Sequence, residues 1–129
     1  MKTLALALAI LLAAPSAWAA GLEVVGHVPG YQCMKLNVTD KQLSSRNHDN
    51  PRILAAPVRN APAITEASSD LIVAAPLNVV NGYAEVLGFD GTQAWIAAKA
   101  IKPWTSSLPA TCTPAMMSNG RLGFDVGLK

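Results

Sequence analysis

The chain has 129 residues, with ten Lys and Arg against eight Asp and Glu and a formal net charge of +2 at pH 7. These charges are scattered, so the sequence has no basic patch of the kind that nucleic acid or an anionic membrane surface requires, and we exclude both as partners. The length suits one domain with a modest core.

The first nineteen residues predict a cleavable secretory signal. Lys2 precedes an unbroken apolar run over residues 4–14, and Ala17 and Ala19 are the small residues that a signal peptidase reads, so we expect cleavage between Ala19 and Ala20. The alternative is a membrane anchor, but eleven apolar residues are far fewer than the roughly 20 that span a bilayer. We therefore expect a periplasmic or secreted protein with no membrane anchor after cleavage.

Residues 20–52 predict an N-terminal arm and a loop. The segment 31–36 alternates well enough for a strand, Thr39 could cap a short helical turn that reaches Leu43, and residues 44–51 are polar. None of these segments is long enough for a helix of three turns.

Residues 53–104 predict the main domain, in which short β-type runs alternate with Pro, Asn and Gly. Asn81-Gly82 predicts a turn, Asp90-Gly91 is the strongest hairpin signal in the chain, and residues 98–100 could form one 3₁₀ turn. The expected strands are 53–59, 71–74, 83–89, 92–97 and 101–104. About five short strands at close spacing predict an all-β fold, a small sandwich or barrel.

Two cysteines, Cys33 and Cys112, bracket most of the exported chain. An even cysteine count in an exported chain indicates a disulfide, which would stabilise by roughly 4–5 kcal/mol on the chain-entropy model. The bridge would tie the tail, residues 105–129, back to the N-terminal arm, so we expect the tail to lie against the domain. The alternative is a nucleophilic Cys33 beside His48 and Asp49, which an oxidised cysteine would rule out.

Part of the main domain resembles the end of a bacterial Src-homology-3-type (SH3-like, SH3b) domain. The residues that carry the resemblance are Gly82-Tyr83-Ala84-Glu85-Val86, Asp90-Gly91, Ala94-Trp95-Ile96-Ala97 and Lys99-Ala100-Ile101, with Pro57-Val58-Arg59-Asn60-Ala61-Pro62 similar to the opening of such domains. Ala94 stands where a Gly is usual. The resemblance covers residues 53–104 and implies a small SH3-like barrel, and the flanks are similar to those of small exported bacterial proteins that carry one.

The sequence lacks the residue patterns of a metal site, a pair of catalytic carboxylates or a phosphate-binding loop. His27 and His48 are far apart and no Cys-x-x-Cys is present, so we expect no metal. Glu85 and Asp90 share one hairpin and are expected to be solvated surface groups rather than paired acids. No phosphate-binding Gly motif is present, so we expect no cofactor and no enzyme, with a cell-wall hydrolase as a minor alternative.

Aromatic residues offer a better candidate site. Alternation along residues 83–89 puts Ala84 and Val86 inside and Tyr83 and Leu87 outside, and the same rule on the next strand puts Trp95 outside. Tyr and Trp are favoured at recognition surfaces, so this patch could bind peptide or glycan, or it could be covered by the arm and the tail as a second small core.

Two functional hypotheses follow. The first is a non-catalytic SH3-like module that binds peptidoglycan or an envelope protein through Tyr83, Leu87, Trp95 and Trp104. The second is a structural or accessory subunit of an envelope complex, with Arg121 in the tail as the contact to its partner. The oligomeric state is left open.

Overall fold

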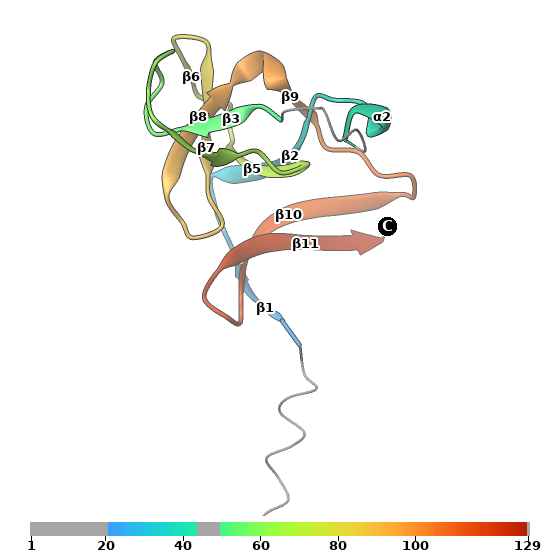
Figure 1. Ribbon diagram of the computed structural model, residues 1–129. Coiled ribbons are helices and arrows are strands. Elements are labelled where there is room, and N and C mark those ends of the chain that lie inside the picture. Colours follow the sequence, from blue (N-terminus) through green and yellow to red (C-terminus); the bar gives the residue numbers. More distant parts are fainter. Residues whose placement is uncertain (1–20, 44–49, 129) are drawn as a thin grey trace, which may run out of the picture.

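The computed structural model describes residues 21–43 and 50–128, and these form an all-β protein built from two sheets (Figure 1). The predicted all-β class is confirmed. The predicted small barrel is not formed, because within the described residues both sheets are open and end in edge strands that pair on one side only. The expected signal peptide, its Ala19–Ala20 cleavage site and His48 lie outside the described residues. No helix within residues 21–43 and 50–128 is long and apolar enough to cross a membrane.

The larger sheet has eight strands and includes the strands of the main domain, residues 53–104. Its order is β4-β3-β8-β7-β5-β2-β9, with β6 paired to β7 beside this path. Within it β2, from the N-terminal segment, lies between β5 and β9 rather than outside the sheet. The strands are β2 (Tyr31–Leu36), β3 (Arg52–Leu54), β4 (Ala63–Glu66), β5 (Asp70–Ala74), β6 (Val79–Val80), β7 (Tyr83–Leu87), β8 (Gln93–Ala97) and β9 (Ile101–Pro103).

The smaller sheet has three strands in the order β1-β10-β11. It joins β1 (Val24–His27) to the hairpin of β10 (Ala110–Met117) and β11 (Leu122–Leu128), so segments from both ends of the described chain contribute to it. Figure 1 shows the hairpin beneath the larger sheet. The tail thus packs against the domain as regular strands.

Local sequence signals explain the turns. Asn81 and Gly82 both have positive φ, at 53° and 83°, as a tight two-residue turn between β6 and β7 requires. In the β7–β8 hairpin, Gly91 has φ 87° and the Thr92 backbone N–H donates to Asp90 Oδ1 at 3.0 Å. Helix α2 (Asp40–Leu43) is a single turn, and Thr39 Oγ1 caps it by accepting from the Gln42 N–H at 3.1 Å. The 3₁₀ turn η2 (Ala98–Ala100) follows β8 as predicted.

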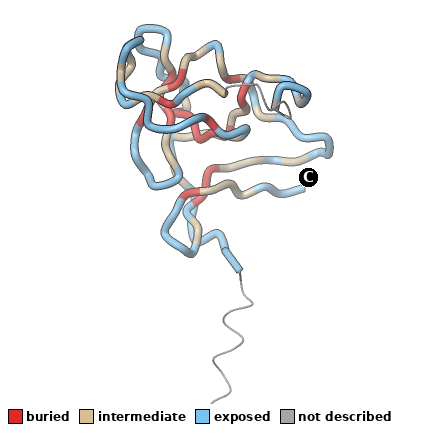
Figure 2. The backbone as a smooth tube through the Cα atoms, viewed as in Figure 1, coloured by how far each residue is buried: buried red, intermediate tan, exposed pale blue. Residues whose placement is uncertain are grey.

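The main core lies on one side of the larger sheet, which we call the inner face. Alternation on β7 and β8 buries Ala84, Val86, Ala94 and Ile96 there, as predicted. Figure 2 shows that buried segments gather in the larger sheet, whereas the far end of the hairpin is exposed. The buried core residues are Leu36, Ile53, Ala67, Leu71, Val73, Ala84, Val86, Ala94, Ile96 and Ile101.

Candidate functional site

The opposite side of the larger sheet, its outer face, carries every candidate binding residue from the main domain. Strand register assigns side chains to this face, because residues directly opposite in an antiparallel pair point the same way. Glu85 pairs with Trp95, Tyr83 with Ala97 and Leu87 with Gln93. The register continues across the sheet through Ile72, Cys33 and Lys35.

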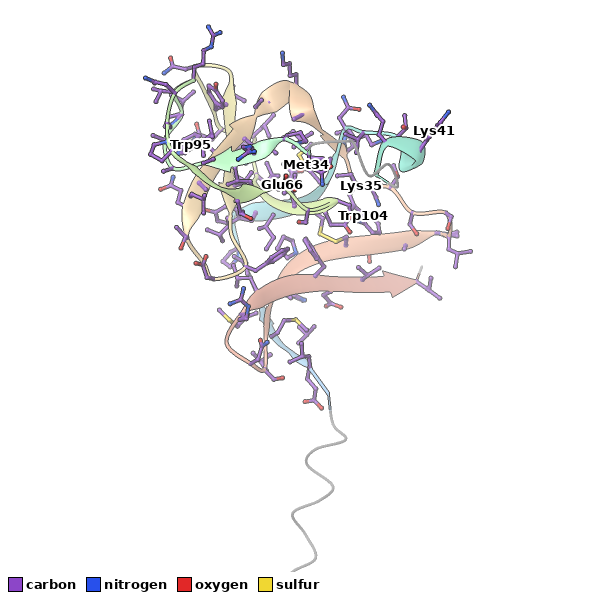
Figure 3. The ribbon with its side chains drawn as sticks, in the orientation of Figure 1. Met34, Lys35, Lys41, Glu66, Trp95 and Trp104 are labelled. Atoms are coloured by element: carbon purple, nitrogen blue, oxygen red, sulfur yellow. A yellow bond between two sulfur atoms is a disulfide. The ribbon has the colours of Figure 1, made fainter. Side chains whose placement is uncertain are left out.

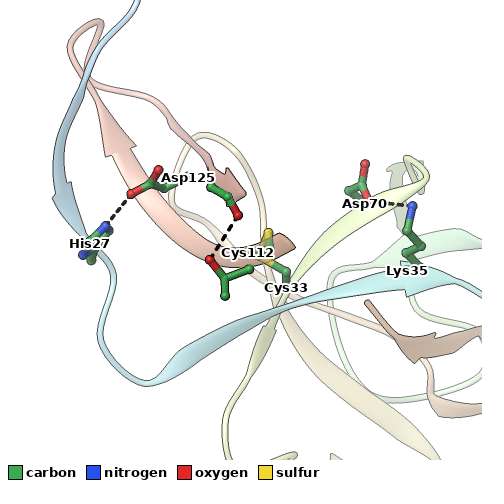
Figure 4. The surroundings of a disulfide bond; sticks show 8 residues. His27, Cys33, Lys35, Asp70, Cys112 and Asp125 are labelled. Atoms are coloured by element: carbon green, nitrogen blue, oxygen red, sulfur yellow. Dashed lines mark hydrogen bonds and ion pairs between the residues drawn. A yellow bond between two sulfur atoms is a disulfide. The ribbon is translucent and has the colours of Figure 1, made fainter. Parts of the chain in front are cut away.

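The hairpin of the smaller sheet covers the middle of the outer face. The predicted disulfide is present: Cys33 on β2 is bonded to Cys112 on β10, with Cα atoms 6.0 Å apart (Figure 4). Ile72, beside Cys33 in the register, is only 1% exposed, and Pro114 on β10 is also fully buried. A second small core therefore exists, but it is confined to the neighbourhood of the bridge.

Beyond the hairpin, the outer face stays accessible at Tyr83 and Trp95. Both side chains are half-buried, and Leu54 on β3 pairs with Trp95 on the other side of β8. With Tyr31 and Glu85 these residues form a patch that we call the aromatic surface. The structure thus brings together Tyr83 and Trp95, two of the four residues predicted to bind ligand.

At the centre of the aromatic surface, Glu85 is held by neutral donors. Tyr31 Oη donates to Glu85 Oε2 at 2.9 Å, and Asn78 Nδ2 donates to Glu85 Oε1 at 2.9 Å. The Asn78 bond, followed by the Tyr31 bond, lowers the pKa of Glu85, so the carboxylate stays ionised at neutral pH. The bond to Glu85 raises the pKa of Tyr31 in turn. Within the described residues Glu85 has no ion-pair partner, so its negative charge is uncompensated.

Leu87 lies apart from this patch. Its register partner is Ile72, which the hairpin covers, and Leu87 lines a small cavity of about 160 Å³ with Ile53 and Phe89. Leu87 is therefore better placed to support packing near the second core than to contact a ligand with Trp95.

Trp104 lies in a separate cleft between the two sheets, far from Trp95 (Figure 3). We call it the Trp104 cleft, and its volume is about 520 Å³. It is lined by Lys35, Asp70 and Lys102 from the larger sheet, by Trp104 directly after β9, by the loop residues Thr105, Ser106 and Ser107, and by Phe124 and Val126 from β11.

Arg121 precedes β11, in the turn that joins the two strands of the hairpin. Its backbone N–H donates to Asn119 Oδ1 at 3.0 Å, and its side chain is exposed and lines a cleft with Phe89 and Asp90. The pKa of Asp90 is lowered, chiefly by hydrogen bonds from Thr92 and to a small extent by the nearby charge of Arg121. Phe89 in turn packs edge-on against Phe124, with ring centroids 5.8 Å apart.

Catalytic and metal sites find no support in the described residues. Both cysteines are consumed by the disulfide, so neither is a free nucleophile. Residues 21–43 and 50–128 contain no group of three or more His, Cys, Asp and Glu side chains placed to hold a metal. His27 Nε2 lies 2.8 Å from Asp125 Oδ2, but both side chains are about half exposed and form an isolated pair.

Sequence reasoning missed three residues of these surfaces. Tyr31 and Asn78 hold Glu85 across separations of 54 and 7 positions, and no local pattern marks such contacts. Lys102 was not predicted, although Trp104 on the same expected strand was a candidate for ligand binding. Alternation from Ile101, which faces the core, could have placed both Lys102 and Trp104 on the outer face.

No protein-family model, curated protein or solved structure matches the chain.

Proposed function

We propose that this protein is a non-catalytic, exported SH3-like binding module that recognises cell-wall material or an envelope protein through its aromatic surface. The observation that carries the proposal is the uncovered state of Tyr83 and Trp95. The hairpin and its disulfide cover Ile72, yet leave these two aromatic residues half-exposed on the same face. Amphipathic aromatic side chains left open on a sheet are favoured anchors for recognition.

Charge complementarity suggests which ligand group this surface takes. Glu85 is ionised, lies directly opposite Trp95 and lacks a cationic partner among the described residues. A carboxylate beside aromatic rings suits an ammonium group, which gains both an ion pair and a cation–π contact. The ligand we propose is therefore an extended peptide with a free amino group, such as the stem peptide of the cell wall.

Retention on purified peptidoglycan tests the surface. We expect the unchanged protein to be retained and Tyr83→Ala and Trp95→Ala to be lost into the supernatant, because each removes an anchor. Val25→Ala, an exposed apolar residue on the smaller sheet, serves as the control and should bind like the unchanged protein. Equal retention of all variants would overturn the assignment of the site, and failure of the unchanged protein to bind would overturn the cell wall as its ligand.

A second experiment tests the proposed ammonium group. An N-acetylated stem tripeptide that contains lysine should bind, and the same N-acetylated peptide with norleucine in place of lysine, which has no amino group, should bind at least about tenfold more weakly. Glu85→Gln keeps the shape of the side chain and one of its two oxygen acceptors but removes the charge, so it should abolish this preference. Glu66→Gln, an exposed carboxylate on β4, is the matched control.

The alternative function is an accessory subunit of an envelope complex that its partner recognises at Arg121. The exposed guanidinium beside the cleft that contains Phe89 favours it. Deleting residues 113–129 would remove β11 and most of β10, so Arg121→Ala is the informative variant. Loss of a co-purifying envelope protein from Arg121→Ala, with peptidoglycan retention unchanged, would favour this function over the first.

A further inference from the structure

The Trp104 cleft is separated from the aromatic surface by the hairpin and differs from it in shape and charge. On β2 the outward residues are Tyr31, Cys33 and Lys35, and the bridge to Cys112 stands on the middle one. Tyr31 serves the aromatic surface through its bond to Glu85, whereas Lys35 lines the cleft. The two areas are therefore neighbours on one strand that lie on opposite sides of the disulfide.

One lysine of the cleft is neutralised within the protein. Lys35 Nζ lies 3.5 Å from Asp70 Oδ1 (Figure 4). It also lies 6.0 Å from the centroid of the Trp104 ring. Asp70 Oδ1 is shielded from solvent and accepts no hydrogen bond from a described residue, so Lys35 is its only nearby compensation. These contacts hold Lys35 in place and position the indole beside it.

The second lysine of the cleft, Lys102, differs from Lys35 because its charge is not paired within the described residues. Lys102 is the register partner of Lys35 and points to the same face, but it forms no ion pair with any residue in the described part of the chain. With Lys35 and Asp70 cancelling, Lys102 leaves the cleft with one net positive charge. A positive charge that lines an open cleft favours an anionic ligand group.

The other residues that line the cleft indicate the chemistry of the remainder of the ligand. The indole of Trp104 offers a flat apolar face with a polar N–H, and Phe124 from β11 lines the cleft from the smaller sheet. Thr105, Ser106 and Ser107 supply three adjacent hydroxyl groups that can donate or accept. A volume of about 520 Å³ lies within the usual range of small-molecule sites, roughly 300–1,000 Å³.

From this combination we infer that the Trp104 cleft is a second binding site, specific for a carboxylate-bearing sugar. The ring of the sugar stacks on Trp104, its hydroxyl groups bond with residues 105–107, and its carboxylate pairs with Lys102. A peptide carboxylate would satisfy Lys102 but would leave the hydroxyl-rich wall and the indole face without partners. The inference does not depend on the aromatic surface, since the two sites share no residue.

Solution NMR of the exported protein tests this inference, with the indole Nε1–H signals of Trp95 and Trp104 as probes of the two sites. We expect the disaccharide of N-acetylglucosamine and N-acetylmuramic acid, or a hyaluronan tetrasaccharide, to shift the Trp104 signal and leave the Trp95 signal in place. Neutral chitotetraose should bind at least about tenfold more weakly, because it lacks the carboxylate.

Two lysine variants test whether sugar binding depends on Lys102 itself or on the total positive charge of the protein. Lys102→Gln should weaken the acidic sugars about tenfold, whereas Lys99→Gln, which removes the same charge from an exposed site on η2, should leave their affinity unchanged. An unchanged Trp95 signal in Lys102→Gln checks the fold. The inference is overturned if neither acidic sugar moves the Trp104 signal or if chitotetraose binds as tightly as the acidic sugars. It is also overturned if the two lysine variants have the same affinity for the acidic sugars. N-acetyl-alanyl-alanine, a peptide carboxylate without a sugar ring, would overturn it by shifting the Trp104 signal as strongly as the sugars do.

Discussion

The aromatic surface and the Trp104 cleft occupy the same face of the same sheet, but they present opposite chemistry. One is a patch of Tyr and Trp around a carboxylate, and the other is a cleft with a lysine. Neither of these two charges has an ion-pair partner among the described residues. The difference arises from the hairpin, which crosses the face at the Cys33–Cys112 bridge and supplies one wall of the cleft without reaching Trp95. A covering element can thus create a cleft at its margin as well as bury a surface.

Removal of the disulfide should have the largest effect on this arrangement. Cys33→Ala with Cys112→Ala releases a loop of 79 residues and should lower the free energy of unfolding by about 2–5 kcal/mol, measured by urea denaturation. The Trp104 indole signal should move because the hairpin forms one wall of its cleft, while the Trp95 signal should stay. A loss below about 1 kcal/mol would mean that the bridge does not hold the two sheets together.

Truncation of Ile72 tests the second core beneath the hairpin. Ile72→Ala removes a side chain that is 1% exposed and should cost about 2–4 kcal/mol in free energy of unfolding. Ile64→Ala, at a residue 52% exposed on β4, is the control and should change stability by no more than about 0.5 kcal/mol. Similar losses in both variants would contradict the separation between the covered and the open parts of the molecule.

The hydrogen bond from Tyr31 to Glu85 should make a smaller contribution. Tyr31→Phe keeps the ring but removes the donor, so we expect a loss of about 1 kcal/mol by thermal or urea unfolding. The same variant should weaken the preference for the lysine peptide, because Glu85 loses one of the donors that fix its carboxylate. An unchanged preference would show that Tyr31 does not position Glu85.

The pH dependence of stability should show the smallest effect, and its sign follows from the two shifts. The folded protein lowers the pKa of Glu85, so the stabilisation that this group contributes is present above its ordinary pKa of 4.5 and is lost as pH falls through the lower folded value. Tyr31 has a raised pKa, so its contribution is present below the ordinary value of 10.0 and is lost as pH rises through the folded one. Unfolding titrations should show a reduced acid loss in Glu85→Gln and a reduced alkaline loss in Tyr31→Phe, and unchanged slopes would contradict the network.

Local residue preferences made the turns and the inward and outward sides of two strands predictable. The Asn81-Gly82 and Asp90-Gly91 turns follow from residues that accept positive φ or bond their own backbone, and alternation on β7 and β8 assigned inside and outside correctly. The bridge between Cys33 and Cys112 followed from the even cysteine count together with the expectation of export.

The rest depends on pairing between distant segments. No local pattern places β2 between β5 and β9, since strand partners are chosen by packing across the whole sheet. The tail was expected to lie against the domain, but its two strands were not predicted. Pro114 lies in the middle of β10, and proline cannot donate to a strand ladder. The structure accommodates it by using its carbonyl, which accepts from the Val28 N–H at 3.0 Å. The open aromatic surface could be proposed from sequence, but its boundary with the hairpin could not.

A paired NMR titration tests most directly whether the hairpin divides one face into two independent sites. The lysine tripeptide should shift only the Trp95 indole signal, the acidic disaccharide should shift only that of Trp104, and prior saturation with one should leave the affinity for the other unchanged. Competition between the two ligands, or movement of both indole signals with either one, would show that the face is a single continuous surface and would contradict the division.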